Sequence, residues 1–316
     1  MIGEGLVYAA FAAAIALPAL PAALELRARR DALPLALDPE YAGDPRYLGK
    51  SFRQKIAGLL RDCEVGSDVQ FLHRANERAR ILDDYEAPAG STQTCAILAR
   101  GAASVGEGAR LLDLFGAESV KVGRGAMLRT VVAGGNIAIG ERVTIARFAD
   151  AERDITVGPH ALIEYGAFAG GTCRLAQHVA FHRLFGNPVA AGKMQSKVEA
   201  ARPAGETIDS DTISAHSIEI AANTLHTGSI KSDGDVVIRA HARIGGNVIA
   251  RGSVHVGTGA SIGGHIYSER DVVLGYDAGA GAPERSKTVH ASGSITLFPG
   301  AYVYGSIVCE GRGETR

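Results

Sequence analysis

The chain has 316 residues, of which 46% are hydrophobic, so it can bury a large core and is not disordered throughout. Lys and Arg number 33 against 34 Asp and Glu, and the net formal charge of -1 provides no basic field for phosphates, so no nucleic-acid partner is expected. The 40 Gly, the absence of Trp and 6% aromatic residues favour a mainly β structure with many tight corners.

The N-terminus carries an apolar segment. Residues 5–24, GLVYAAFAAAIALPALPAAL, are uncharged and about as long as a helix that crosses the hydrocarbon core of a membrane. Pro18 and Pro21 predict a kink or an early end of this helix. Basic residues that would flank the membrane follow at once: Arg27, Arg29 and Arg30. The positive-inside rule therefore predicts a single-pass protein of the inner membrane, with the remaining chain in the cytoplasm.

Two alternatives to a membrane helix stay open. A secretory signal peptide would need a basic n-region, but the residues before the apolar run include Glu4 and no Lys or Arg. An apolar helix packed on the protein or lying at the membrane surface is the other.

Residues 31–90 are predicted to form a Pro-containing, helical neck. Ser51 and Gln54 fit a capping box for a first amphipathic helix over residues 51–60. Ser67 and Gln70 repeat that signature ahead of a second helix in VQFLHRANERARILDDYE. The two apolar stripes are Phe52, Ile56, Leu59 and Leu60, and then Val69, Leu72, Ala79 and Leu82. We interpret both helices as a cap on the domain that follows, with partner binding as the alternative.

An 18-residue spacing of aliphatic residues is the strongest pattern in the chain. In the second half, Ile218, Val236, Val254 and Val272 form one such column. In the first half, Ile137, Ile155 and Cys173 form another. Apolar residues that alternate with polar ones within each turn are typical of short strands with one buried face. Stacking these turns about 4.8 Å apart would build a continuous core, so the pattern predicts a single-stranded β-solenoid of roughly ten turns.

The repeat is divided into two blocks. Residues 91–189 are predicted to hold the first and residues 212–310 the second, with a linker or protruding loop at 190–211 and a tail at 311–316. The register shifts by five after an insertion at 276–288 and then holds. Glycines with positive φ are expected at the corners: Gly134, Gly135, Gly245, Gly246, Gly263 and Gly264. Whether the blocks form one continuous solenoid or two packed ones stays open.

The segment DVVIRAHARIGGNVIARGSVHVGTGASIGGHIYSERDVVLG, residues 235–275, resembles the bactofilins, which are polymer-forming bacterial cytoskeletal proteins. The likeness is clearest over residues 208–308 and weaker over residues 94–185. It implies a right-handed β-helix of triangular section that polymerises end to end without nucleotide, often beside the membrane. The implied role is in cell shape or envelope organisation.

A self-association edge is expected at the last turn of the second block. Its candidate residues are Phe298, Tyr302, Val303, Tyr304, Ile307 and Val308. An uncovered strand edge with such side chains pairs readily with another chain. The alternative is that these residues complete the core.

The main rival interpretation is an enzyme, because left-handed hexapeptide-repeat acyltransferases also use 18 residues per turn. Such enzymes place a general-base His in a cleft between trimer subunits, and a related γ-type carbonic anhydrase binds zinc through three His. The candidates are His160, His178 and His182. Solvated surface positions are the commoner fate of such residues, so we expect no catalytic residue, metal or cofactor. Cys63, Cys95, Cys173 and Cys309 form no CxxC pair and are interpreted as reduced thiols.

The sequence thus predicts a membrane-anchored cytoplasmic scaffold that self-associates through a β-solenoid. Its expected partners are other copies of itself, the inner membrane and envelope or cell-wall proteins.

Overall fold

A computed structural model describes residue 17 and residues 44–70, 78–193 and 205–316. The chain divides into two compact units, Met1–Asp44 and Pro45–Arg316. The membrane helix predicted over residues 5–24 lies outside the described residues, except for Leu17. Its predicted basic flank also lies outside them. No helix in the described part of the chain is both long and apolar enough to cross a membrane.

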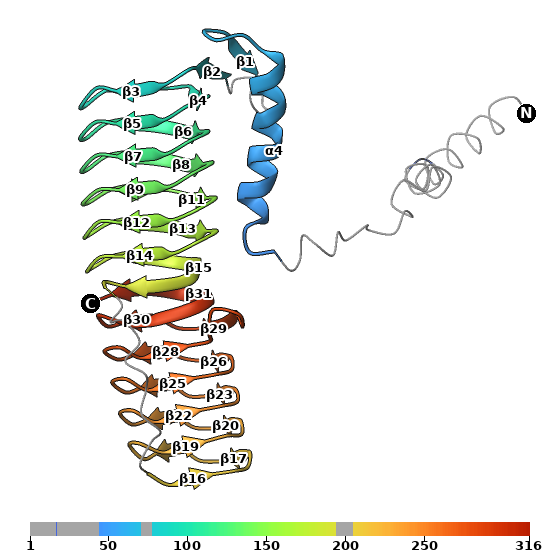
Figure 1. The fold of residues 1–316 in the computed structure, drawn as a ribbon, viewed down its shortest axis with the longest axis vertical. Helices are drawn as coiled ribbons and strands as arrows, with labels where there is room; N and C mark the ends of the chain where they lie inside the picture. The colour runs from blue at the N-terminus through green and yellow to red at the C-terminus, as the bar shows by residue number, and fades with distance from the viewer. Residues whose placement is uncertain (1–16, 18–43, 71–77, 194–204) are drawn as a thin grey trace, which may run out of the picture. The chain divides into compact units, whose positions relative to one another are not determined.

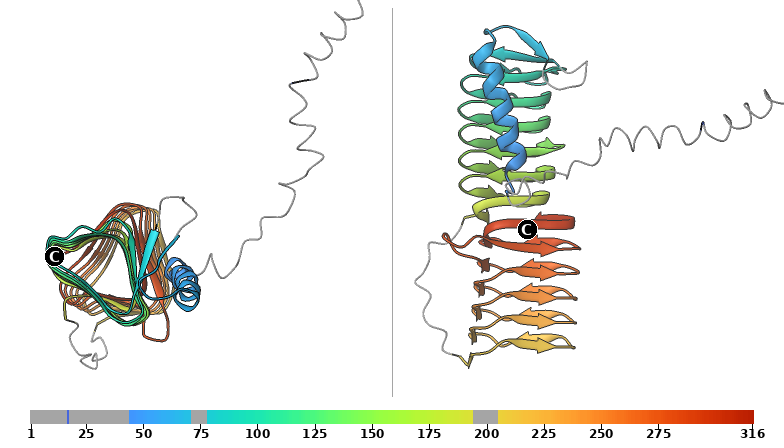
Figure 2. Two further views of the ribbon diagram at one scale, coloured as in Figure 1. Left: turned by 90° about the horizontal axis from the view of Figure 1, so that it is seen from above. Right: turned by 90° about the vertical axis from the view of Figure 1, so that its right-hand side faces the viewer.

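The second unit is a β-solenoid of about 13 turns, preceded by the one helix among the described residues (Figure 1). Viewed along its axis, the solenoid has a three-sided section (Figure 2). The predicted mainly β solenoid is therefore confirmed.

Its helix and the strands of the first block are α4 Tyr47–Asp62, β1 Asp68–Gln70, β2 Arg78–Leu82, β3 Tyr85–Ala87, β4 Ala96–Ala99, β5 Ala103–Val105, β6 Arg110–Gly116, β7 Val120–Val122, β8 Met127–Ala133, β9 Ile137–Ile139, β10 Thr144–Ile145, β11 Phe148–Ala151, β12 Ile155–Val157, β13 Leu162–Ala169, β14 Cys173–Leu175 and β15 Ala180–Ala191.

The strands of the second block are β16 Thr207–Ile208, β17 Thr212–Ser214, β18 Ile218–Ile220, β19 Leu225–His226, β20 Ile230–Ser232, β21 Val236–Ile238, β22 Arg243–Ile244, β23 Val248–Ala250, β24 Val254–Val256, β25 Ser261–Ile262, β26 Ile266–Ser268, β27 Val272–Leu274, β28 Gly279–Ala280, β29 Lys287–Ala291, β30 Ile295–Leu297 and β31 Tyr302–Thr315.

Successive turns stack by parallel pairing in the register that the sequence predicts. Ile155 pairs with Ile137 on one side and with Cys173 on the other. Val272 pairs with Ile295, a step of 23 residues that equals 18 plus the predicted shift of five. The paired aliphatic residues point inward and form one core through both blocks, which leaves each strand an outward position between them.

Side chains at the corners supply hydrogen bonds that the short strands cannot make. Asp235 Oδ1 accepts from the backbone N–H of Ser253 at 2.7 Å, and Asn247 Oδ1 accepts from that of His265 at 2.8 Å, each one turn along the stack. Among the described residues, left-handed backbone occurs at six corner residues other than Gly: Arg142, His160, His178, Asn223, His241 and Asp277.

The glycine pairs are needed for a different reason than the positive φ expected from the sequence. None of the six has a positive φ, but a Cβ at Gly246 or Gly264 would overlap the backbone of the preceding turn. These glycines are required because the chain of one turn lies directly against the next.

Helix α4 packs along the outer face of the first block. It contains the helix predicted over 51–60, but it begins at Tyr47 with Arg46 as N-cap, so Ser51 is not a cap. The helix predicted across residues 69–86 is wrong, because Asp68–Gln70, Arg78–Leu82 and Tyr85–Ala87 are strands. In β2, Ala79 and Ile81 are buried between exposed or half-buried neighbours, which is a strand pattern.

An outward apolar column on the first block receives α4. Ile81, Leu98, Phe115, Val132 and Phe168 belong to one cluster with Ile56 of the helix. Asp150 occupies one position in that column, and its carboxylate accepts hydrogen bonds from Arg46 and Arg53 of α4. Gly49 lies between these two arginines, where a Cβ would overlap the carboxylate. The absence of a side chain at Gly49 thus allows the helix to lie directly on Asp150.

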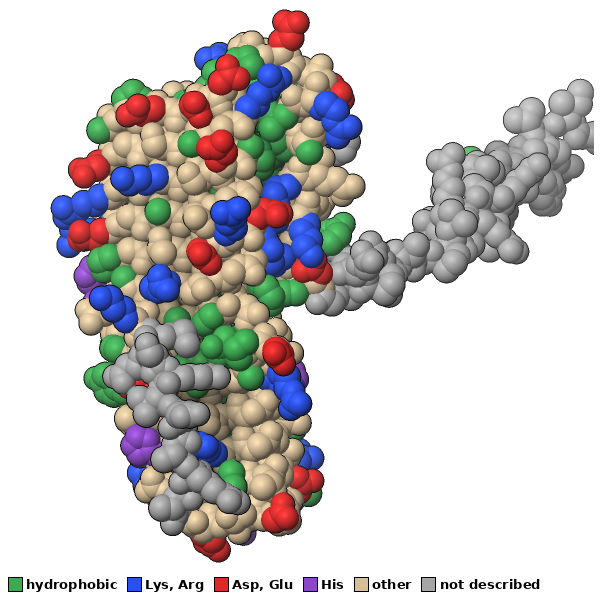
Figure 3. Space-filling model, viewed as in Figure 1, with side chains coloured by type: hydrophobic (Ala, Val, Ile, Leu, Met, Phe, Trp, Pro, Cys, Tyr) green, Lys and Arg blue, Asp and Glu red, His purple; other side chains and the backbone are tan. Residues whose placement is uncertain are grey.

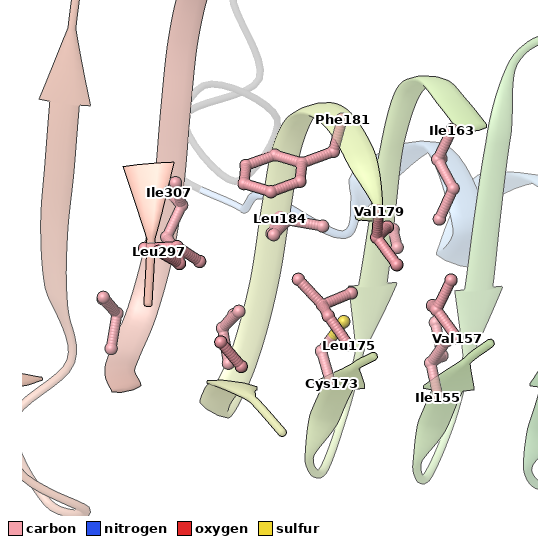
Figure 4. Packing of buried hydrophobic residues seen from close by; sticks show 14 of the residues in the cluster. Ile155, Val157, Ile163, Cys173, Leu175, Val179, Phe181, Leu184, Leu297 and Ile307 are labelled. Carbon is pink, nitrogen blue, oxygen red and sulfur yellow. The ribbon is translucent and has the colours of Figure 1, made fainter. Parts of the chain in front are cut away.

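The two blocks meet at their last turns, which we call the junction. The strand β15 pairs antiparallel with β31, the last strand of the chain, over all three sides of the section (Figures 1 and 2). Phe181 and Leu184 of the first block face Ile307 and Leu297 of the second across this contact (Figure 4). The second block therefore winds back toward the first, and its own first turn, β16–β18, lies at the far end.

Candidate self-association surface

The first turn of the second block, β16–β18, forms what we call the open end. Its strands pair with β19, β20 and β21 on one side. No described strand pairs with their other side. Three strand edges, one on each side of the section, are consequently available together.

The unpaired backbone groups of the open end belong to one residue in each strand. The N–H of Thr212 donates to Ser229 O, and Ser214 O accepts from Asp233 N, so both residues point into the stack. Neighbouring residues of a strand direct their backbone groups to opposite sides. The N–H and C=O of Ile213 therefore point away from the stack, and the same alternation selects Thr207 in β16 and Glu219 in β18.

The side chains at the open end are a mixture of apolar and polar groups. Ile213 is 78% exposed on the outer face, while Ile208 and Ile218 are half-buried at the rim. Inside, the buried His226 ring is hydrogen-bonded through Nε2 to Thr212 Oγ1 at 2.8 Å and through Nδ1 to Gly228 O at 3.1 Å. The open end is therefore less apolar than the junction, where the inward side chains are Phe181, Leu184, Val303 and Ile307.

Residues 205–220 contain four carboxylates, Glu206, Asp209, Asp211 and Glu219, and no Lys or Arg. Three of these carboxylates bind groups of the next turn. Asp211 Oδ1 accepts from Ser229 N at 2.6 Å, and Asp209 accepts from the Thr227 hydroxyl. Glu219 accepts from Arg239 Nε at 2.7 Å, and this hydrogen bond lowers the pKa of Glu219 below its usual value. The charges are thus directed back along their own stack, away from the unpaired edge.

The ends of the first block are occupied in different ways. At its beginning, β1 pairs antiparallel with β2 and covers the outer edge of that strand. At its end, β15 is paired with β31.

The self-association edge predicted at residues 298–308 lies at the junction, where its strand is already paired. Tyr302, Val303, Ile307 and Val308 all pair with β15 of the same chain. The sequence gives no local signal for this, because the partner strand lies more than a hundred residues away. The unpaired residues Thr207, Ile213 and Glu219 were not among the predicted site residues. They belong to an ordinary repeat turn and differ only in that no described turn of the second block precedes them.

The histidines considered for catalysis lie on the outer corners and in β15. The rings of His160 and His178 stack one turn apart, with centroids 5.0 Å apart, as the 18-residue spacing predicts. His182 lies in β15, and its backbone oxygen accepts a hydrogen bond from the Cys309 thiol. Across the described ranges, no three His, Cys, Asp or Glu side chains gather closely enough to hold a metal ion.

All four cysteines are free thiols. Burial raises the pKa of Cys173 to about 12 and that of Cys309 to about 11, so both stay protonated at neutral pH. Basic and acidic side chains are interspersed on the face seen in Figure 3, which forms no field of a single sign there.

Comparison with known proteins assigns no family. Neither a scan against protein-family models nor searches of curated proteins and of solved structures found a match. The resemblance to the bactofilins therefore stays a prediction, and the open end is the surface on which a functional proposal can be built.

Proposed function

We propose that this protein is a scaffold that self-associates through the open end of its β-solenoid. The observation that carries the proposal is the set of three unpaired strand edges at β16–β18. Unpaired edges of this kind are templates for pairing with another chain. The junction between β15 and β31 supplies a second argument, since two solenoid ends of this same chain already pair in that manner.

The proposal also places the scaffold at the inner membrane, with the solenoid in the cytoplasm and contacts to envelope or cell-wall proteins. The uncharged residues 5–24 and the basic flank at Arg27, Arg29 and Arg30 support this placement. Alkaline phosphatase fused after Arg316 is expected to be inactive, and an active fusion would contradict this orientation.

The proposed surface is tested with Ile213→Pro in the full-length protein, kept in a mild detergent throughout. Proline removes the N–H that points away from the stack and leaves the bonds to β20 intact. A buried C=O deprived of its donor costs about 1–3 kcal/mol, so we expect self-association to weaken by roughly tenfold or more. Light scattering over a concentration series measures this.

Ile213→Val is the matched control, because it keeps the backbone donor and a β-branched side chain. We expect it to associate as the unchanged chain does, with both variants showing the circular dichroism of the unchanged fold. Equal association of the proline variant and the unchanged chain would show that the open end is not the surface.

A further inference from the structure

We infer that self-association of this protein stops at two copies, joined open end to open end about a two-fold axis. The inference rests on the proposed function and adds the partner, the register and the size of the assembly. A filament, a lateral bundle and a complex with a short peptide are the outcomes it excludes.

The argument for a second copy begins with the geometry of the open end. Its three unpaired strands lie on the three sides of one turn. An added peptide strand could pair with one of them and would leave two edges in water. Another solenoid end has strands on all three sides of a matching section, so it can pair with all three edges at once.

The internal junction shows how two such ends fit together. Across it, Leu184 lies opposite Ile307, Phe181 opposite Gly313, and Val189 opposite Val303. The middle part of β31, which also pairs with β29, thus lies opposite the middle of β15. The first part of β31 lies opposite the last part of β15, and the last part of β31 lies opposite the first part of β15. This exchange is the arrangement that a two-fold axis perpendicular to the solenoid would produce.

The same operation applied to the open end fixes its register. A two-fold axis that passes between the two copies of β17, next to Ile213, places Ile213 opposite its own copy, and it places Thr207 opposite Glu219 of the second molecule. These three residues are the ones whose backbone groups point away from the stack. Directly opposed residues of this type exchange two hydrogen bonds, so the three pairs would make about six. The two Ile213 side chains would also cover each other on the outer face.

The contact closes because, among the described strands, only β16–β18 form an end with three unpaired edges. The last turns of both blocks are joined in the junction. The first turn of the first block has one edge covered by β1. A two-fold contact uses the same surface on both molecules, so no open end remains after two copies have joined.

The test is cross-linking of Ile213→Cys in the full-length protein by a short bismaleimide. Opposed residues of antiparallel strands have Cα atoms about 5.5 Å apart, so two Cys at this position lie within reach. We expect most of the protein to become a covalent dimer, and the mass from light scattering before cross-linking to reach that of two chains and no more. Ile213 is exposed, so this change leaves the fold intact.

The matched control is Ile249→Cys, which lies in the same outward column and is also exposed. It is two turns further from the end, so its copy would be about 24 Å away in the proposed dimer at a turn spacing near 4.8 Å. We expect it to give no more covalent dimer than the unchanged chain, whose half-buried Cys63 and Cys95 set the background.

The outcomes separate the inference from the function on which it rests. A full-length chain that stays monomeric at every concentration overturns both. Association without a link at position 213, or equal linking at position 249, overturns the end-to-end geometry but leaves self-association standing. A mass above two chains, or filaments in negative stain, overturns closure alone.

Discussion

At the scale of single residues, Asp150 is a charged group that lies beneath α4. Its side chain is fully buried in an otherwise apolar column, and burial raises its pKa above the usual value although Arg53 and Arg46 oppose that shift. Removing one partner of a buried ion pair leaves a charge without compensation. The arginines of α4 therefore offset part of the cost of burying this carboxylate beneath the helix.

We expect Arg53→Met to lower the free energy of unfolding by about 3 kcal/mol at pH 7. The loss should shrink as the pH falls. An acid whose pKa is higher in the folded state than in the unfolded chain destabilises the fold at pH values above that raised pKa, and protonation removes the cost. Chemical denaturation at several pH values measures both effects.

Arg61→Met on the same helix is the control, because Arg61 is exposed and its loss should change stability by no more than about 0.5 kcal/mol. A pH-independent loss in Arg53→Met would mean that the arginine contributes packing alone.

At the scale of the element, the position of α4 depends on Gly49, which has no side chain. The apolar stripe at Phe52 and Ile56 predicts a helix and the face it buries. The stripe alone does not determine where the helix lies along the column of similar apolar side chains on the first block. The contact between Gly49 and Asp150 selects one position, since any side chain at residue 49 would meet the carboxylate.

Two Gly→Ala changes in α4 should have opposite effects. Gly58→Ala has open space around the new methyl group and should raise the free energy of unfolding by about 0.5–1 kcal/mol, as expected in a helix interior. Gly49→Ala should lower it, because the helix must move off Asp150. Thermal unfolding by circular dichroism compares them, and stabilisation by both changes would contradict the close approach at Gly49.

The sequence predicts the repeat well because its cause is local. Most inward strand positions carry an aliphatic residue, so the columns through Ile155 and Val272 could be found by spacing alone. The turn of β2 and β3, which precedes the predicted block at 91–189, was missed because its repeat is 17 residues, as between Ala79 and Ala96, and because its buried residues include Ala79 and Ala87. In β2, Arg78 and Arg80 alternate with Ala79 and Ile81 of the column that receives α4, and from the sequence alone these arginines are interpreted as the polar face of a helix.

At the scale of the whole molecule, the pairing of block ends could not be predicted. Nothing in the repeat distinguishes a last turn that meets its own chain from one that meets another molecule. The candidate residues at 298–308 combine strand edges with aromatic side chains, which are properties of an interface. The partner strand β15 is distant in sequence, and only the reversal of winding direction brings it there.

Residues 205–220 carry four carboxylates, of which Glu219 is paired with Arg239, so two joined open ends repel each other. We expect dimerisation to strengthen severalfold when NaCl rises from roughly 50 to 500 mM, because screening shortens the range of this repulsion. Asp209→Asn with Asp211→Asn removes two charges per chain and should reduce this salt dependence. Sedimentation equilibrium measures both. Weakening by salt would indicate a basic partner surface in place of a second copy.

The position of β31 at the junction has a consequence for synthesis. The ribosome adds β31 after all the other described strands, so a growing chain holds the final turn of its first block unpaired until β31 has been made. Phe181, Leu184 and Val189, which are buried in the finished protein, have no cover from β31 during that interval. A chain released before Tyr302 would carry this apolar end permanently. The 14 residues of β31, of which 311–315 fall in the predicted tail, therefore determine whether a newly made molecule leaves the ribosome with an aggregation-prone surface.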